Sequence, residues 1–463
     1  MNEKRNSFSS SIGFVLAAAG SAVGLGNIWR FPYLAAKDGG GLFLVIYIIL
    51  ALTFGFTMIV SETAIGRKTK QSALTAYGTL HKPSKWIGVF ACLVPFMILP
   101  YYCVIGGWVL KSCVAFLTGG GAAAAEDGYF TGFITDLWPP IIFDVIFLLA
   151  VAVIIYLGVN KGIESLSKVL MPVLLVMVVG IAIFSLTIKG REGGLSAMDG
   201  LKVYLIPSLA GMGVKDVFIV VLDAMGQLFY SISVAMGIMV TYGSYFRDDS
   251  NLMKSVNQIE LFDTVVAFLA GIMIIPAVYV FLGEEGMRSS GPGLMFIALP
   301  RVFAEMGVVG NVVGAVFFLM VLLAALTSAM SVLEAVVASL IDAFGWSRRK
   351  ATIIESTLAL VIGILVCLGY NVLYFKVKLP NSSTADSQLL DIIDYISNNV
   401  LMPVVAIGTC ILIGWLVGPK TVIDEATKNG ERFGRKGLYI VMIKFIAPVM
   451  LFLLLLGSVG IIH

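Results

Sequence analysis

A glycine-rich, polar stretch interrupts the first long apolar segment of the chain. It covers residues 20–32 and reads GSAVGLGNIWRFP. A membrane helix is normally continuous and apolar at this depth, because lipid offers no hydrogen-bond partners to a freed backbone group. A helix broken there must give its carbonyls and amides to protein, to an ion or to a bound molecule. The stretch therefore predicts a binding site near the middle of a membrane.

The composition places the whole chain in a lipid bilayer. Hydrophobic residues make up 59% of the 463 positions and charged residues only 13%, which is far from the balance of a soluble protein. Apolar stretches of roughly 18 to 27 residues predict about eleven spans in a single transmembrane domain over 1–463. The predicted spans are 11–36, 42–66, 86–117, 140–158, 167–187, 217–244, 259–283, 305–343, 351–371, 391–417 and 436–461.

Basic residues gather in alternate loops, which sets the predicted orientation. They occur at Lys4 and Arg5, at 67–85, at Lys161, at 247–254, at 348–350 and at 420–436. The rule that basic loops stay inside predicts a cytoplasmic amino terminus and, with an odd number of spans, an extracellular His463 in a multi-pass protein of the cell membrane. The small residues 17–20 could alternatively end a cleaved signal peptide. The apolar run continues past them, which favours a span.

Residues for other kinds of chemistry are scarce. The five cysteines all fall inside predicted spans without disulfide or metal spacing, so we expect them to act as small buried residues. Only two histidines are present, and we find no nucleophile beside a base and no nucleotide-binding loop. A net charge of +3 fits basic inner loops and does not indicate nucleic acid. The sequence therefore argues against an enzyme.

A second span, over 217–244, is interrupted in the same way. Residues 227–237 read QLFYSISVAMG, which is again small and polar at mid-depth. If the chain is two repeats of five spans, this sixth span opens the second repeat. Two broken helices at matched positions indicate an inverted-repeat transporter with its site at the bilayer centre. The alternative is that glycine and serine only permit close helix packing.

Together these motifs resemble the neurotransmitter:sodium symporter family, in its bacterial amino-acid transporter branch. They are residues 20–32 followed by DGGG at 38–41, Glu62 with Gly66 and Arg67, residues 227–233 with TYGSY at 241–245, and AALTS at 324–328. The likeness covers essentially the whole chain. It implies an all-α, leucine-transporter-like fold with two inverted five-helix repeats, about 11–187 and 217–417, broken helices 1 and 6, and an extra helix at about 436–461.

The resemblance also implies two sodium sites. One comprises the carbonyls of Gly20, Val23 and Ala324 with the hydroxyls of Thr327 and Ser328. The other comprises the Ala22 carbonyl, the Asn27 amide oxygen, the Ser231 hydroxyl, the carboxylate of the substrate and an oxygen from the seventh span. Without the resemblance, we would expect the hydroxyl of a threonine in an apolar helix to bond to its own backbone more often than to an ion.

Asp263 is the most informative residue of the seventh span. An aspartate at membrane depth costs a few kcal/mol unless it has a partner, so we expect it beside the sodium. In animal members a chloride ion lies here, at positions that match Tyr47, Gln227, Ser231, Asp263 and Ala267. Because Asp263 is acidic and Ala267 is apolar, the resemblance predicts transport that does not need chloride. In this prediction Asp263 supplies the fixed negative charge and can carry a proton on the return stroke. The alternative is an aspartate near a helix end that faces water.

The first break also predicts the substrate. Free amides at Gly24, Leu25 and Gly26 favour an anionic group. Monoamine members carry an aspartate at the position of Gly24, so its absence implies an amino acid with its own carboxylate, which Tyr102 should bind. The resemblance gives a side-chain pocket of Ser21, Ile98, Tyr230, Ser233, Met236, Ser328 and Val332. None is charged, which implies an apolar or aromatic side chain.

Gates and supports follow from the same resemblance. Arg30 and Asp394 match an outer gate above the rings of Tyr102 and Tyr230, and Arg5 and Asp342 match an inner gate near Ser244 and Tyr245. Alternatively, each pair is a solvated charge at a helix end. Glu62 should brace the broken helices. Gly162 and Pro172 should let the fifth span unwind, and Pro100 predicts a kink in the third.

The sequence thus predicts sodium-coupled symport of a neutral apolar or aromatic amino acid into the cell by alternating access. A proton-coupled carrier of the same architecture would not need Thr327 and Ser328 as ligands. A non-transporting amino-acid sensor would bind the same molecule without flux. The oligomeric state does not follow from the sequence.

Overall fold

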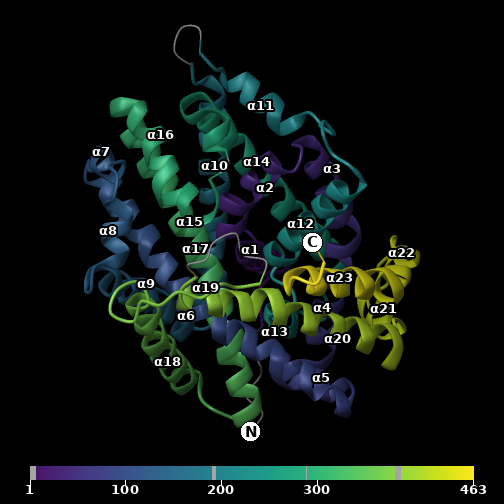
Figure 1. The fold of residues 1–463 in the computed structure, drawn as a ribbon. Helices are drawn as coiled ribbons and strands as arrows, with labels where there is room; N and C mark the ends of the chain where they lie inside the picture. Colours follow the sequence, from purple (N-terminus) through teal and green to yellow (C-terminus); the bar gives the residue numbers. More distant parts are fainter. Residues whose placement is uncertain (1–6, 190–193, 288, 381–386, 463) are drawn as a thin grey trace.

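The computed structural model describes residues 7–189, 194–287, 289–380 and 387–462. Within these ranges the chain forms helices and loops, and its only strand-like pairs are two isolated bridges, Gly40 with Pro207 and Val377 with Ser387. Figure 1 shows the helices packed into one bundle. The predicted all-α class is confirmed.

The first predicted span is a broken helix. It consists of α1 (Ser11–Ala22), the π-helical turn η1 (Gly26–Arg30) and α2 (Phe31–Lys37), and the two parts are bent by 51°. The backbone leaves α1 at Val23, whose ψ of 88° is not helical. Pro32, the second residue of α2, follows η1 directly and cannot donate an amide hydrogen bond to that preceding turn.

The sixth predicted span is broken as well, between α12 (Val214–Ser231) and α13 (Ile238–Ser244). Here Ser233 and Ala235 have φ values of 54° and 61°, a region that residues with a side chain rarely adopt. The fully buried Glu62 supports this strained segment, because its Oε1 accepts a hydrogen bond of 2.7 Å from the Ala235 amide. Strain of about 1–3 kcal/mol per residue is typical of functional segments.

Most of the remaining spans are long helices that some π-helical turns interrupt without breaking. They are α3 (Gly41–Leu50), η2 (Ala51–Gly55) and α4 (Phe56–Thr69); the turn η3 (Lys82–Ser84) with α6 (Lys85–Leu117); α9 (Pro139–Leu157); η4 (Val159–Glu164) with α10 (Ser165–Thr187); α14 (Leu252–Gly286); α17 (Gly307–Phe344); α18 (Arg348–Leu368); α19 (Leu389–Asp394), η6 (Tyr395–Leu401), α20 (Met402–Ile411) and η7 (Leu412–Leu416); and α22 (Lys436–Val441), η8 (Met442–Ile446) and α23 (Ala447–Ser458).

Shorter helices lie in the connections. These are α5 (Ala73–Leu80), α7 (Gly121–Ala124), α8 (Tyr129–Thr135), α11 (Ala197–Leu205), α15 (Gly291–Gly293), η5 (Leu294–Ala298), α16 (Leu299–Glu305) and α21 (Lys420–Ala426). The connection between the seventh and eighth spans is therefore largely helical, with α15, η5 and α16.

Nine helices of the described chain are long and apolar enough to cross a membrane, or ten when the bent pair of α1 and α2 is one span. The remaining predicted span, the sixth at 217–244, falls short of this measure. The reason is local, since α13 has only seven residues and α12 carries Lys215, Asp216 and Asp223. Its crossing of the membrane stays a prediction.

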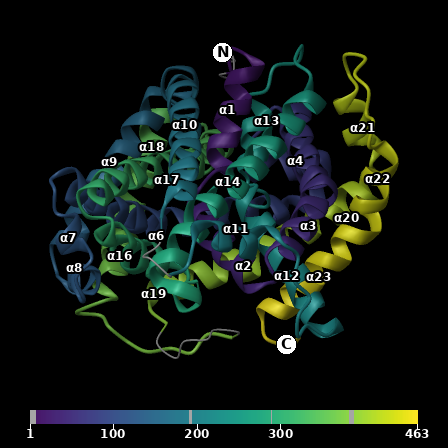
Figure 2. The same ribbon diagram turned by 90° about the horizontal axis from the view of Figure 1, so that it is seen from above.

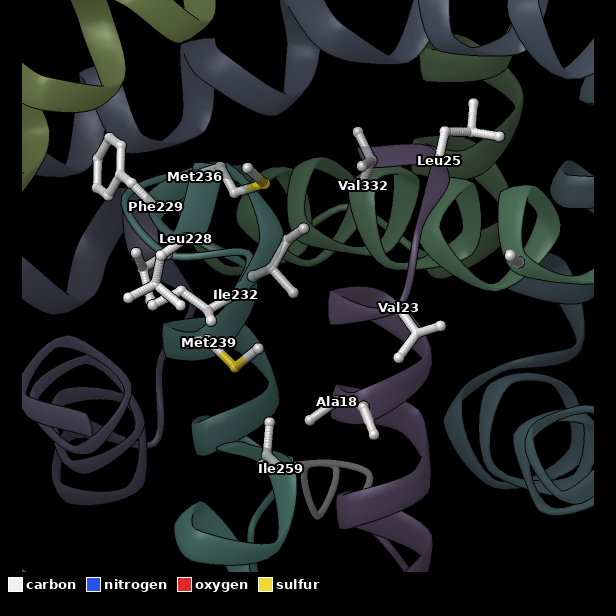
Figure 3. Packing of buried hydrophobic residues seen from close by; sticks show 14 of the residues in the cluster. Ala18, Val23, Leu25, Leu228, Phe229, Ile232, Met236, Met239, Ile259 and Val332 are labelled. Carbon is white, nitrogen blue, oxygen red and sulfur yellow. The ribbon is translucent and has the colours of Figure 1, made fainter. Parts of the chain in front are cut away.

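The two breaks lie at the centre of the bundle. α1 packs against α10, α14 and α17, and α13 packs against α4 and α17. Figure 2 shows α1 and α14 in the middle, with α20, α22 and α23 along one side. Figure 3 shows Val23 of the first break and Ile232 of the second in the same hydrophobic cluster as Val332 of α17.

Candidate functional site

The two breaks line a small cavity of about 30 Å³. This is room for about two water molecules, so an amino acid fits only when the walls of the cavity move apart. Every residue predicted to bind substrate lines it, and so do Asn27 and Ile238; the full set is Ser21, Ala22, Gly24, Leu25, Gly26, Asn27, Ile98, Tyr102, Tyr230, Ser231, Ser233, Met236, Ile238, Ser328 and Val332. Ile238, the first residue of α13, was not predicted, because its role depends on how far the second break extends.

One end of the cavity is polar and holds an unused donor. The Tyr102 hydroxyl is buried and has no hydrogen-bond partner among the described residues. The Leu25 amide and the Ser328 hydroxyl lie beside it. A Cβ atom placed on Gly24 would come within 2.9 Å of Ser328 Oγ and 3.4 Å of the Tyr102 hydroxyl. Glycine at position 24 therefore keeps a space that faces both hydroxyls.

The other end of the cavity is mostly apolar. Ile98, Met236 and Val332 are nearly fully buried. The hydroxyls of Ser21 and Ser233 bond to each other at 3.0 Å, and each break is thereby tied to the other. None of the described residues lining the cavity carries a charge. This end suits an uncharged group.

Four side chains from four different spans meet beside the cavity. Asp263 Oδ1 accepts hydrogen bonds from Asn27 Nδ2 at 2.8 Å and from Ser231 Oγ at 2.6 Å, and its Oδ2 accepts one from the Tyr47 hydroxyl at 3.2 Å. Asp263 is fully buried inside α14, so it does not face water at a helix end. The Asn27 oxygen in turn accepts from Ser231 Oγ at 3.1 Å. This group combines one negative charge with neutral oxygen donors, as a sodium ion prefers.

A second set of oxygens lies where α17 crosses α1. Ser328 Oγ is 3.4 Å from the Gly20 carbonyl and 3.2 Å from that of Ser21, and a Cβ on Gly20 would lie 3.2 Å from Thr327 Cβ. Thr327 Oγ1 donates to the carbonyls of Leu323 and Ala324. Hence Gly20, Ala324, Thr327 and Ser328 are neighbours, while Thr327 also shows the back-bonding expected of any threonine in a helix. Val23 is buried at the end of α1.

The predicted outer pair is close but not in direct contact. Asp394, the last residue of α19, accepts a hydrogen bond of 2.6 Å from Asn398 Nδ2, and Asn398 also donates to the Tyr101 hydroxyl at 3.1 Å. Arg30 interacts with Asp394 electrostatically, yet no ion pair within 4.0 Å joins these two described residues. Asn398 and Tyr101 were not among the predicted residues. They lie within apolar spans whose pairing only the fold reveals.

At the opposite end, Arg5 lies outside the described residues. Its predicted partner Asp342 accepts 2.6 Å hydrogen bonds from the amide and the hydroxyl of Ser72. Tyr245 donates its hydroxyl to Glu334 Oε1 at 2.6 Å, and its carbonyl accepts from the Phe8 amide at 3.1 Å. These contacts join the amino-terminal segment, α13 and α17.

Glu334 is a residue that the sequence reasoning missed. It is fully buried in α17 and forms a bidentate ion pair with Arg348, the first residue of α18, at 2.6 and 2.9 Å. A glutamate inside an apolar helix is itself a signal of function. The same argument that singled out Asp263 could have found it.

The expected unwinding of the fifth span is absent from this structure. Gly162 lies in the π-helical turn η4, where a Cβ would come within 2.0 Å of the Ile154 carbonyl, and Pro172 stands inside the continuous helix α10. Unwinding in another state stays a prediction. Pro100 likewise lies inside an uninterrupted α6.

Comparison with known proteins gives one consistent result. The model of the sodium:neurotransmitter symporter family matches residues 5–120 and 140–462. The sodium-dependent transporter YhdH of Bacillus subtilis is 33% identical over 99% of both chains, and the human sodium- and chloride-dependent GABA transporter 2 is 26% identical over 91% of this chain and 75% of its own. The crystal structure of MhsT in complex with L-phenylalanine superposes with a TM-score of 0.85 at 34% identity, over 98% of this chain and 100% of that one.

Proposed function

The chain belongs to the sodium:neurotransmitter symporter family, and from that premise we propose that it carries a neutral apolar or aromatic amino acid into the cell together with sodium. It is a multi-pass membrane protein and a sodium-dependent transporter, not an enzyme, and it has the fold of MhsT. The amino acid, the number of sodium ions and the independence from chloride are the parts that we propose.

The observation that carries the proposal is the buried Tyr102 hydroxyl, which has no hydrogen-bond partner among the described residues and lies beside the space at Gly24. Leaving a buried donor unsatisfied costs about 1–3 kcal/mol, so such a group is typically kept for a ligand. A substrate carboxylate in this space accepts the Tyr102 hydrogen bond and faces the amides at the start of the second half-helix, whose dipole favours negative charge.

The uncharged end of the cavity determines which substrate side chains can bind. A charged substrate side chain would be buried there without a partner, at a cost of several kcal/mol. Met236 adapts to differently shaped groups because its side chain is long and unbranched. That MhsT was solved with L-phenylalanine supports an apolar or aromatic substrate.

Sodium and substrate meet at the group formed by Asn27, Ser231 and Asp263. In the proposal, one ion takes oxygens from Ala22, Asn27, Ser231 and the substrate carboxylate, so each cargo raises the affinity for the other by roughly 1–3 kcal/mol of coupling. Asp263 supplies the negative charge that a chloride ion would otherwise bring. A second ion takes oxygens from Gly20, Val23, Ala324, Thr327 and Ser328.

Alternating access then needs the two ends of the cavity to open in turn. We infer that Arg30 and Asp394 close the outer end, and that the contacts of Asp342 and Tyr245 close the inner end, beside the cytoplasmic amino terminus. The repeats 11–187 and 217–417, with the extra helix 436–461, provide the two sets of helices that move. Glu62 holds the second break while they do so.

Equilibrium binding of labelled amino acids to the purified protein tests this proposal. We expect saturable binding of leucine, phenylalanine or tryptophan in sodium, little in potassium at equal ionic strength, and weaker binding to Tyr102→Phe. Equal binding in both salts would favour a proton-coupled carrier. Binding without transport into vesicles would favour an amino-acid sensor.

A further inference from the structure

A second, open cavity lies at the start of α14, away from the central site. It has a volume of about 430 Å³ and is lined by Asn251, Met253, Lys254, Asn257, Gln258, Leu261 and Arg432. Arg432 comes from the loop between α21 and α22, so the cavity is formed by two distant parts of the chain. Neither the sodium sites nor the amino-acid site uses any of these residues.

Two positive charges in this cavity have no acidic partner. Among the described residues, the side chains of Lys254 and Arg432 form neither an ion pair nor a hydrogen bond. Neighbouring cations differ, since Arg435 pairs with Glu260 at 2.9 Å and Lys428 pairs with Asp248 at 3.1 Å. The side chains of Lys254 and Arg432 are thus available to an anion.

The cavity also lies at the boundary between polar and apolar surface. α14 begins at Leu252, where the Asn251 side chain caps the helix by accepting from the Lys254 amide at 2.8 Å. About 10 Å further along the helix, Leu261 is 62% exposed, and Val265 beyond it is 40% exposed. Large exposed apolar side chains on a membrane helix face lipid. The cations therefore stand at headgroup level above a lipid-facing surface.

We propose that this cavity binds the phosphate headgroup of an anionic phospholipid, whose acyl chains follow Leu261 and Val265. Lys254 and Arg432 contact the phosphate, and the side-chain amides of Asn257 and Gln258 donate to its oxygens or to the glycerol. Basic pockets at the ends of membrane helices bind anionic headgroups in this way, with a contribution from each cation. The amino-terminal end of α14 adds a favourable dipole.

The site has no requirement for sodium or amino acid, so it can be tested independently of the proposed transport. We would measure binding of a fluorescent phosphatidylglycerol to the full-length protein in detergent, with competition by unlabelled phosphatidylglycerol, phosphatidylcholine and inorganic phosphate. We expect competition by phosphatidylglycerol alone. Effective competition by phosphatidylcholine would reveal a non-specific lipid contact, and by inorganic phosphate a site for soluble anions; either result overturns the proposal.

A charge-matched pair of variants identifies the cavity. Lys254→Gln with Arg432→Gln removes both cations and should weaken phosphatidylglycerol binding about 10- to 30-fold. Lys82→Gln with Lys85→Gln removes two exposed cations that also lack partners among the described residues but do not line this cavity. This pair should change phosphatidylglycerol binding less than twofold. Equal effects of the two pairs, or none, would contradict the proposal. Cooperative thermal unfolding of each variant in detergent verifies that it has folded.

Discussion

The Asp263 carboxylate accepts a hydrogen bond of 2.8 Å from the side-chain amide of Asn27, although 236 positions separate the two residues in the chain. This bond connects the first break to the middle of α14. It brings a buried negative charge to a residue that is expected to bind sodium. The ion dependence of transport should therefore be sensitive to Asp263.

Neutralising this charge should change which ions the protein needs. In Asp263→Asn we expect a sodium affinity at least tenfold lower, or uptake that now requires chloride, because a buried sodium ion would lack its counter-charge. Uptake into vesicles in sodium chloride and in sodium gluconate measures both effects. Asp144→Asn removes an equally buried carboxylate from α9, outside the site, and should leave the ion dependence unchanged. Unchanged ion dependence in Asp263→Asn would contradict the role of Asp263 as the counter-charge of sodium.

A single methyl group should close the carboxylate space. Gly24→Ala places a Cβ 2.9 Å from Ser328 Oγ and 3.4 Å from the Tyr102 hydroxyl, so we expect at least a tenfold loss of amino-acid affinity. The fold should survive, since the closest atom belongs to a small side chain. Gly180→Ala is the matched control, because a Cβ there meets nothing within 4 Å. Equal amino-acid affinities of the two variants would show that the substrate carboxylate binds elsewhere.

Thr327 allows the ligand role to be separated from simple back-bonding. Thr327→Val keeps the shape but loses the hydroxyl, and we expect a several-fold lower sodium affinity in amino-acid binding titrations. Ser339→Ala removes a hydroxyl of the same helix that bonds to the Ala335 carbonyl at 2.7 Å, and should have no such effect. If the two variants behave alike, Thr327 only satisfies its own helix.

The buried pair of Glu334 and Arg348 should be important for stability. Arg348→Gln leaves Glu334 charged and without its bidentate partner, which typically costs about 3–5 kcal/mol. Thermal unfolding in detergent should show a clear loss. Adding Glu334→Gln should restore most of the stability, because no buried charge then remains. A double variant as unstable as the single one would mean that the loss has another cause.

Asp38, just after α2, should make the free energy of unfolding depend on pH. Burial, followed by the nearby charge of Asp223, raises the pKa of Asp38 to about 7, while Lys37 opposes the shift. The folded protein then holds the proton more tightly than the unfolded chain, so stability falls as pH rises from about 4 to about 7. Between pH 5.5 and 7 this amounts to about 2 kcal/mol, at 1.36 kcal/mol per unit.

Melting temperatures at pH 5.5 and 8.5 test this effect. Asp38→Asn should lose part of the pH dependence of the native chain. The exposed Asp199 is a suitable control, since the hydrogen bond and charge of Lys202 lower its pKa, so it stays ionised over this range. Asp199→Asn should melt with the native pH dependence, and a native-like slope for Asp38→Asn would contradict the assignment.

The sequence was a good guide to the breaks because their cause is local. Glycine and serine at mid-membrane depth predict interrupted helices, and the cavity is built almost entirely from the two interruptions. Ser21 and Ser233 each lie inside one of these motifs, and the structure joins them by a 3.0 Å bond. The family resemblance supplied the residues from other spans, such as Tyr102 and Asp263.

The features that could not be predicted from the sequence depend on packing between distant segments of the chain. α14 begins at Leu252, seven residues before the predicted 259, because its first turns are polar and hydropathy does not detect a helix that extends beyond the apolar layer. The pairing of Glu334 with Arg348 requires the turn between α17 and α18. Arg30 and Asp394 match a gate in sequence, yet no ion pair within 4.0 Å joins these two described residues.

The most direct test of the account is uptake of labelled phenylalanine by the protein in lipid vesicles under an inward sodium gradient, with gluconate as the only anion. The account predicts concentrative uptake that disappears when potassium replaces sodium and does not increase when chloride replaces gluconate. Uptake that a proton gradient drives without sodium, or that requires chloride, would contradict it.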